Sequence, residues 1–407
     1  MTQILRDLGL KPATHEPCFY SGTFDGKRVL FLRQVDDFAV AAADKNTAMD
    51  LITAINAKMR IEVKHLGLID RFNGMDIHQT RHFVKITCEK YLHKMIKGHA
   101  DLLQHIPINP VPLPADNNYI KSLETATVPT TIPEKLQLKQ EMGFNYRQLI
   151  GEIIFPMMKC RPEIAPHGIK LSQYMENPAR EHYQAIRDIL SYLSKTIDDG
   201  IYYWRKTPRM DLPDVALPTI HQDNYLMEDN TPNDGDLYGY TDSDWATDTV
   251  HRKSISGIVI MFAGGAVGYK CKYQDVIAHS STEAEFTAAC DAGKMILFFR
   301  SILADLGLEQ KNATVLYEDN NGALMMANAQ QPTRRTRHMD IKKFALLDWV
   351  EEDLIILRSI KTAENAADGM TKPLAKQLFQ RHSDTILGRR VPDYVKRSNK
   401  ELRWDIK

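Results

Sequence analysis

Residues 237–380 contain a series of short apolar segments whose order restricts the fold of this part of the chain. Strands are predicted at 237–241, 255–262 and 266–272, and Gly264-Gly265 predicts a hairpin turn between the last two. A long amphipathic helix from about residue 282 to Gly307 is followed by a strand at 314–317, helices at 323–329 and 341–351, a strand at 354–360 and a final helix from about 363. Because hairpins precede α/β units, we predict one mixed sheet flanked by helices.

Four acidic residues stand at the ends of these predicted elements. Asp242 and Asp319 follow predicted strands, whereas Glu285 and Asp368 lie in the first turns of predicted helices. Strand ends and helix starts meet at one edge of an open α/β sheet, so we expect the four carboxylates to lie together. Mg²⁺ takes oxygen ligands of this kind, and a pair of such ions promotes phosphodiester hydrolysis.

Each acid also has an ordinary structural interpretation. Glu285 completes a Thr282-x-x-Glu capping box, Asp242 and Asp319 are typical turn acids, and Asp368 is typical of a solvated helix. Position alone therefore leaves the metal site undecided.

The rest of the chain predicts further units. Residues 1–98 read as mixed α/β, with a hairpin (29–32 and 38–40) that has Asp36 and Asp37 at its tip, a helix at 47–59, a hairpin over 72–77 and 83–87, and a helix at 89–96. Residues 99–206 are predicted to be mostly helical after a proline-rich loop that extends to about 135, 207–236 a linker, and 381–407 a peripheral polar tail.

Six local motifs occur in series within 237–380. They are YTDSDWATD (240–248), RKSISG (252–257), SSTEAEF (280–286), EDNNGAL (318–324), TRHMDIKKF (336–344) and NAADGMTKPL (365–374). In this order and at this spacing they resemble the ribonuclease H domain of copia-type LTR retrotransposon Pol polyproteins. The resemblance implies a ribonuclease H-like mixed five-stranded sheet, Mg²⁺ with Mn²⁺ as an alternative, and cleavage of RNA in RNA–DNA hybrids by a two-metal mechanism.

By this resemblance the catalytic and metal-binding acids are Asp242, Glu285, Asp319 and Asp368. Glu283 competes with Glu285, which is preferred because the E-x-x-A pattern matches ribonucleases H in general. Asp244 could be confused with Asp242 and is interpreted as a loop acid.

The resemblance continues upstream. LRQVDDFAVAA (32–42) resembles the reverse transcriptase palm hairpin, which implies metal binding by Asp36 and Asp37, and YRQLIGEIIF with CRPEIA (146–155, 160–165) resembles the segment that links polymerase to ribonuclease H. Gln34 stands where the family has an aromatic residue, and FNGMDI (72–77) replaces a Phe-Leu-Gly motif. The third palm aspartate is expected before residue 1, so we predict a partial palm (1–98), a thumb or connection (99–206) and no polymerase activity from this chain alone.

A basic cluster is the main candidate for nucleic-acid contact. It comprises Arg334, Arg335, Arg337, His338, Lys342 and Lys343, and a solvated basic face is the alternative interpretation. Lys270 and Lys272 alternate on a predicted strand and are expected to face the hybrid. Trp245, next to the acids, is interpreted as a core residue rather than a stacking platform. The expected partners are an RNA–DNA hybrid and the remainder of a reverse transcriptase.

Bulk composition sets limits on these expectations. The formal net charge is zero, so any nucleic-acid surface must come from local clustering. The five scattered cysteines show no zinc spacing and predict reduced thiols in an intracellular protein. The resemblance to the retrotransposon family implies a location in the cytoplasm, within virus-like particles, or in the nucleus. We expect neither membrane association nor a small-molecule cofactor. The competing hypothesis is a catalytically inactive retroelement remnant that binds nucleic acid.

Overall fold

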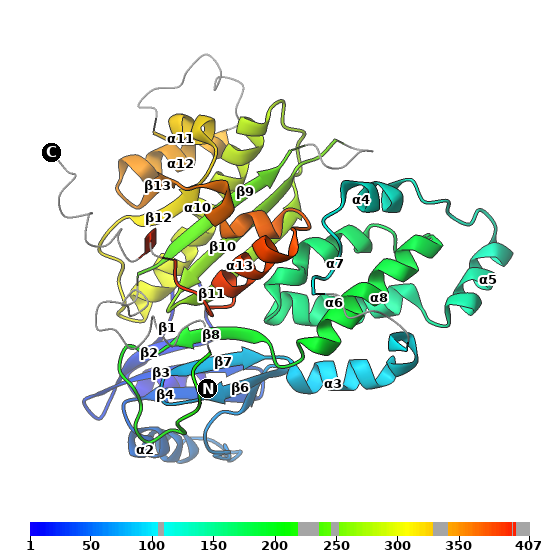
Figure 1. The fold of residues 1–407 in the computed structure, drawn as a ribbon. Coiled ribbons are helices and arrows are strands. Elements are labelled where there is room, and N and C mark those ends of the chain that lie inside the picture. The colour runs from blue at the N-terminus through cyan, green and yellow to red at the C-terminus, as the bar shows by residue number, and fades with distance from the viewer. Residues whose placement is uncertain (105–109, 219–235, 246–251, 329–340, 393, 396–407) are drawn as a thin grey trace.

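The computed structural model describes residues 1–104, 110–218, 236–245, 252–328, 341–392 and 394–395. This part of the chain contains three sheets, with strand orders β1-β2-β3-β4, β5-β6-β7-β8 and β11-β10-β9-β12-β13. Figure 1 shows the two four-stranded sheets below the five-stranded sheet, with a group of helices beside them. The mixed, multidomain α/β architecture expected from the sequence is therefore present.

The first sheet is an antiparallel meander. Its predicted hairpin is confirmed, because β3 (Lys27–Gln34) pairs with β4 (Asp37–Ala42) through a turn in which Val35 has a φ of 54°. The remaining elements of this unit are α1 (Thr2–Asp7), β1 (Leu10–Pro12), β2 (Phe19–Phe24) and α2 (Lys45–Asn56). Burial of Leu51 and Ile55 against the sheet anchors α2, whose N-terminus is capped by the Asp44 side chain.

The second sheet is formed by segments that are far apart in the chain. β5 (Arg71–Phe72), β6 (Met75–Gln79) and β7 (Phe83–Thr87) are joined by β8 (Gly200–Trp204), which pairs antiparallel with β7. The segment 99–206 therefore does not form a purely helical unit: it ends in a strand that completes a sheet of the preceding segment.

The helices between β7 and β8 form their own layer. They are α3 (Glu89–Gly98), α4 (Asn117–Glu124), α5 (Ile132–Met142), α6 (Tyr146–Lys159), α7 (Ala165–Ser172) and α8 (Arg180–Lys195), with 3-10 turns η1 (Ala100–Leu103) and η2 (Pro162–Ile164). The prediction of mostly loop up to 135 is wrong at α4, because the proline spacing concealed a short helix capped by Asp116.

No helix among the described residues is both long and apolar enough to cross a membrane.

The five-stranded sheet follows the predicted order of elements. Its first three strands are β9 (Tyr238–Asp244), β10 (Ile255–Phe262) and β11 (Gly265–Tyr273), and β10 pairs antiparallel with both β9 and β11. The other two strands are β12 (Thr314–Glu318), which pairs parallel with β9, and β13 (Ile355–Ser359), which pairs parallel with β12. Between them lie α10 (Ser281–Asp305), α11 (Asn321–Ala327) and α12 (Ile341–Glu351).

Three local predictions in this unit were wrong. The hairpin turn uses Ala263 and Gly264, both at positive φ, and Gly265 already belongs to β11. β9 extends to Asp244, so Asp242 lies within the strand rather than after it. The final helix near 363 is instead two 3-10 turns, η3 (Thr362–Glu364) and η4 (Ala366–Met370), followed by α13 (Lys376–Ile386).

Helices cover the two faces of this sheet differently. Ile258, Ile260 and Leu316 pack with α10, α11 and α12 in one core cluster. Tyr240, Val259 and other residues of the opposite face belong to a second cluster that is continuous with α6, α7, α8 and α13. The helical layer and the five-stranded sheet therefore share a core.

The predicted linker 207–236 lies partly outside the described residues, because the structure does not describe residues 219–235.

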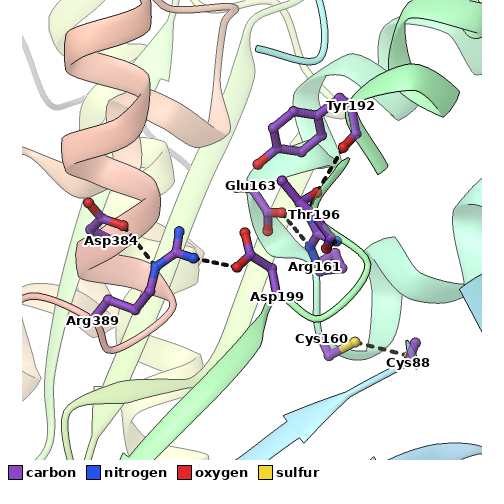
Figure 2. A network of polar contacts seen from close by, with 9 residues as sticks. All are labelled: Cys88, Cys160, Arg161, Glu163, Tyr192, Thr196, Asp199, Asp384 and Arg389. Carbon is purple, nitrogen blue, oxygen red and sulfur yellow. Dashed lines mark hydrogen bonds and ion pairs between the residues drawn. The ribbon is translucent and has the colours of Figure 1, made fainter. Parts of the chain in front are cut away.

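Polar contacts reinforce the same junction. Arg389 binds Asp384 of α13 through Nε (2.8 Å) and Asp199, just before β8, through Nη1 (2.5 Å), as Figure 2 shows.

The C-terminal segment is packed into the protein, because Val391 and Val395 are buried. The prediction of a peripheral tail from 381 is therefore wrong for residues 381–392, 394 and 395, because their apolar side chains complete a core that local sequence polarity does not reveal.

Candidate functional site

Three acidic side chains from different elements meet at one edge of the five-stranded sheet. Asp242 of β9, Glu285 of α10 and Asp319, directly after β12, each offer a carboxylate oxygen within 4.8 Å of the others. In the described part of the chain this is the only such grouping of three or more acids, histidines or cysteines. The parallel pairing of β9 with β12 places the strand residues side by side, as expected.

The start of α10 determines which glutamate enters the cluster. Ser280 is the N-cap, and its hydroxyl accepts from the Glu283 backbone N–H at 3.2 Å. The Glu283 carboxylate turns back to accept from the His279 backbone N–H at 2.9 Å. A Thr282–Glu285 capping box is therefore absent, and Glu285 is left to face the acids.

A glycine brings the two helix starts together. A Cβ on Gly322, in the first turn of α11, would lie 2.7 Å from the Thr282 hydroxyl. Real Cβ atoms do not approach so closely, so a larger residue at this position would require the Thr282 side chain or one of the two helix starts to shift. This close approach, encoded by the EDNNGAL and SSTEAEF motifs, places Asp319 near Glu285.

The fourth predicted acid, Asp368, lies on η4 next to the cluster. Asn365 anchors this turn by donating to the Thr241 carbonyl at 2.9 Å. Gly257 of β10 leaves room for it, since a Cβ there would lie 2.7 Å from the Ala367 carbonyl oxygen. Asp368 is held by an ion pair with Lys372 at 2.5 Å, so it adjoins the trio without belonging to the 4.8 Å group.

Burial and the charge of neighbouring acids raise the pKa of Asp242 and of Glu285. Desolvation, then the charge of Asp368, raises the pKa of Asp242 to about 7, although a hydrogen bond from Thr371 opposes the shift. Desolvation, then the charge of Asp242, raises the pKa of Glu285 to about 11. The Glu285 Oε2 atom is buried and has no hydrogen-bond partner within the described ranges of the chain. In the metal-free site these raised pKa values favour protonated carboxyls, which avoids placing several negative charges together in a buried position.

Sequence reasoning missed three residues of this site. Glu318, the last residue of β12, is completely buried, and desolvation raises its pKa well above the usual value. Thr371 donates to Asp242, and Lys372 pairs with Asp368. All three fall inside motifs quoted above, so their motif membership was the available signal; Glu318 was overlooked because strand alternation does not distinguish it from an ordinary core position.

Asp36 and Asp37 lie apart from this cluster. Both are exposed on the β3–β4 hairpin, Asp36 in the turn and Asp37 at the start of β4. Within the described ranges, no third acid, histidine or cysteine joins them in a possible ligand group. Metal binding by this pair stays a prediction.

The predicted nucleic-acid contacts are only partly described. Arg334, Arg335, Arg337 and His338 lie outside the described residues, as do the side chains of Lys342 and Lys343 on α12. Lys270 pairs with Asp291 at 2.8 Å and Lys272 with Asp275 at 2.9 Å. Both lysines are therefore paired with acids, which weakens the prediction that they face a hybrid.

Trp245 is not a core residue, contrary to the prediction. It is 46% exposed, and its indole N–H donates to the Ala278 carbonyl at 3.1 Å. The exposed position arises because β9 ends at Asp244, one residue before it. Asp244 itself is the last strand residue rather than a loop acid.

Comparisons with solved structures add little to this description. The compost-derived LC11-RNase H1 matches 33% of this chain and 92% of its own, with 16% identity and a TM-score of 0.27. The foamy viral protease–reverse transcriptase in complex with an RNA/DNA hybrid matches 84% of this chain and 41% of its own, with 14% identity and a TM-score of 0.29. No family model matches the sequence.

Comparisons with curated sequences cover most of the chain. The retrovirus-related Pol polyprotein from transposon TNT 1-94 of Nicotiana tabacum is 28% identical over 368 residues, and that from transposon RE1 of Arabidopsis thaliana is 24% identical over 368 residues. A secreted RxLR effector protein 161 of Plasmopara viticola is 31% identical over 147 residues, which are 36% of this chain and 85% of that protein. The chain spans 25% and 22% of the two Pol polyproteins. Across 90% of its length, the chain is a homologue of retrovirus-related Pol polyproteins from plant transposons.

Proposed function

We propose that this chain is a metal-dependent nuclease of the ribonuclease H type, which hydrolyses the RNA strand of RNA–DNA hybrids. The observation that carries the proposal is the convergence of Asp242, Glu285 and Asp319 within 4.8 Å, with the buried Glu285 Oε2 atom lacking a hydrogen-bond partner. Homology to retrovirus-related Pol polyproteins from plant transposons supports the substrate class.

The donor set fits a hard divalent cation. All the available ligand atoms are carboxylate oxygens, which Mg²⁺ prefers, and no cysteine or histidine belongs to the group. Lys372 supplies one positive charge and is already paired with Asp368. Cations bound between the carboxylates would relieve the repulsion that raises the pKa values of Asp242 and Glu285.

Each residue has a defined part in the proposed mechanism. Asp242, Glu285, Asp319 and Asp368 hold two Mg²⁺ ions, with Mn²⁺ as an alternative. Such a pair, when bound, stabilises charge on the attacking and leaving oxygens of a phosphodiester. Thr371 orients Asp242 through its hydroxyl, and Lys372 fixes Asp368 while keeping positive charge beside the site. Glu283 acts only at the helix N-terminus.

The basic segment 334–343 is proposed to contact the backbone of the hybrid. It joins α11, which begins beside the acidic site, to α12. Recognition of a hybrid depends mainly on groove shape and 2′-hydroxyl groups, so phosphate contacts from arginines are sufficient to position it.

The test is cleavage of a labelled RNA–DNA hybrid by the purified chain. We expect Mg²⁺-dependent cleavage of the RNA strand, no cleavage of duplex DNA, and a loss of at least about 100-fold in Asp319→Asn. Asp50→Asn, an exposed acid on α2, is the matched control and retains full activity. Unchanged cleavage by Asp319→Asn would remove Asp319 from the site.

The competing hypothesis, a remnant that binds nucleic acid without cutting it, gives a different result in the same assay. Hybrid binding without turnover at millimolar Mg²⁺ in the wild-type chain selects it. Retention of three converging carboxylates favours the nuclease.

A further inference from the structure

Two cysteines from distant parts of the chain meet below the five-stranded sheet. Cys88 is the N-cap residue of α3, directly after β7, and Cys160 is the C-cap residue of α6. Figure 2 shows their side chains pointing toward each other, with a Sγ–Sγ distance of 2.9 Å. Both residues are fully buried, and neither is part of a disulfide.

The separation of these sulfur atoms is close to what a disulfide requires. An S–S bond is about 2.05 Å long, so a displacement of about 0.9 Å would suffice. Both cysteines lie at helix ends, with backbone conformations outside the regular helix (φ −118° at Cys88 and −153° at Cys160). A small adjustment at either position does not break the hydrogen-bond ladder of a helix interior.

The pair lies where the layers of the molecule join. Cys160 precedes Arg161, whose guanidinium group binds the carbonyl and hydroxyl of Thr196 at the end of α8 (Figure 2). Tyr203 of β8 is close enough for the Cys160 thiol to influence its ionisation. A covalent link here would connect the second sheet and α3 to α6, next to the core shared with the five-stranded sheet.

We propose that Cys88 and Cys160 are a redox-active pair that forms an intramolecular disulfide when the protein meets a low-molecular-weight disulfide such as oxidised glutathione. One thiolate attacks the glutathione disulfide and releases one glutathione; the second thiolate attacks the resulting mixed disulfide and releases the other. Two protons and two electrons leave the cysteines, and one oxidised glutathione becomes two reduced molecules.

Burial makes this exchange slow and selective. The thiolate is the attacking species, and the neighbouring Cys88 thiol together with desolvation raises the pKa of Cys160 well above its ordinary value. Reaction therefore proceeds through locally opened conformers, after which the short sulfur separation favours ring closure over a stable mixed disulfide. Cys18, which is only half-buried and has no nearby thiol partner assigned, should stop at the mixed disulfide.

The first experiment maps the bonds in the wild-type chain. The protein is incubated with oxidised glutathione in urea below its unfolding transition, alkylated and digested with trypsin. We expect a dithiothreitol-sensitive species that joins peptide 86–90 to peptide 160–170. If Cys18 is fully glutathionylated while this species is absent, or if Cys88 is linked to another cysteine, the proposal is overturned.

The second experiment measures thermal unfolding of oxidised and reduced protein. Because the link closes a loop of about 70 residues, oxidation should raise the unfolding midpoint by about 5 °C. Cys88→Ala and Cys160→Ser should abolish this difference, and Cys18→Ser should retain it. A midpoint that oxidation leaves unchanged in the wild-type chain counts against the pair. Nuclease activity does not enter either test, so this proposal and the proposed function can fail independently.

Discussion

Thr371 donates its hydroxyl to Oδ2 of Asp242 at 2.6 Å, although 129 residues separate them in the chain. The same hydroxyl lies 3.1 Å from the Asp368 carbonyl oxygen of its own turn. One buried side chain therefore connects the central strand of the sheet to the turn that carries the fourth acid. The hydrogen bond lowers the pKa of Asp242, in opposition to the larger effect of desolvation.

Replacing Thr371 by valine tests this relationship. Loss of a hydrogen bond to an ionised group costs about 1.5–3 kcal/mol, so the variant should need roughly 10- to 150-fold more Mg²⁺ for half-maximal cleavage. Since the bond lowers the pKa of Asp242 from a higher value, its removal should also shift the acidic limb of the pH–rate profile upward. Thr371→Ser keeps the hydroxyl and should behave as wild type. A normal Mg²⁺ dependence in Thr371→Val would assign the hydroxyl a purely structural role.

Glu285→Gln should abolish cleavage and yet stabilise the metal-free fold. The raised pKa of Glu285, about 11, means that the folded state holds a proton which the unfolded state releases above pH 4.5. This contribution to stability is complete below the unfolded pKa and is lost as pH rises toward the folded pKa. Glutamine has no such loss, so at pH 8 without metal the variant should be more stable than wild type, by up to about 5 kcal/mol, measured by urea unfolding.

Added Mg²⁺ should reverse this order. Ions that bind the ionised carboxylates should stabilise the wild-type fold more than the variant, which has lost one carboxylate. The stabilisation should be larger at pH 8.5 than at pH 5.5, where protons compete for Asp242 and Glu285. The check is the shift of the thermal midpoint on addition of millimolar MgCl₂. Equal shifts in wild type and Glu285→Gln would place the ion elsewhere.

The sequence predicted the elements of the five-stranded sheet well because each has a strong local signal. Gly307 after a periodic helix indicated the end of α10, whose last helical residue is Asp305, and apolar segments on either side of a glycine turn located β10 and β11. Contacts between distant segments left no such signal. The pairing of β8 with β7 joins Gly200 to Thr87, and the burial of Val391 depends on a core formed by other elements.

The candidate site shows the same division. Residue type and motif order identified Asp242, Glu285, Asp319 and Asp368, and the structure brings the first three together. Glu318 was not predicted as a site residue, because its burial depends on the tertiary structure and the local sequence does not show it. The contact of Glu283 with the His279 backbone, together with the place of Glu285 in the acidic group, favours Glu285 as the second acid.

Arg161 and Glu163 form a buried ion pair whose disruption should be costly. They are 0% and 1% exposed, and the Arg161 Nε atom lies 2.6 Å from Glu163 Oε1. Arg161→Met leaves the Glu163 carboxylate buried without its ion-pair partner and removes two hydrogen bonds to Thr196. We therefore expect a loss of about 3–5 kcal/mol in the free energy of unfolding.

Matched variants separate charge from packing in this pair. The double variant Arg161→Met/Glu163→Leu should recover part of the loss, since neither charge then remains buried. Arg209→Met removes an exposed ion pair with Asp211 and should change stability by less than about 1 kcal/mol. Urea unfolding followed by circular dichroism measures all three. A double variant no more stable than Arg161→Met would assign the cost to lost packing.

The basic segment should control the salt dependence of hybrid binding. Each arginine that contacts a phosphate contributes just under one unit to the slope of log affinity against log salt concentration. Replacing Arg334, Arg335 and Arg337 by glutamine should therefore lower that slope by about 2.7 and weaken binding at low salt, without altering the Mg²⁺ requirement of cleavage. Fluorescence anisotropy with a labelled hybrid measures the slope. An unchanged slope would identify the cluster as a solvated face.

His167 should make the fold sensitive to mild acid. It is 1% exposed beside the Phe379 ring, and desolvation lowers its pKa to about 3. Neither ring nitrogen has a hydrogen-bond partner among the described residues. Below pH 6.5 the unfolded chain binds a proton that the folded state excludes, so stability is full above that pH and falls as pH decreases. Between pH 7.5 and 5.0 the loss from this residue is about 2 kcal/mol.

His167→Leu should remove that loss, because leucine fills the same apolar site without a titrating group. The free energy of unfolding in urea, measured at pH 7.5 and 5.0, should fall less in this variant than in wild type by about 2 kcal/mol. His65→Leu, at an exposed position, should retain the wild-type dependence. Parallel pH dependences in wild type and His167→Leu would show that the buried imidazole accepts a proton without cost, and that the interface between α7 and α13 admits the water needed to solvate it.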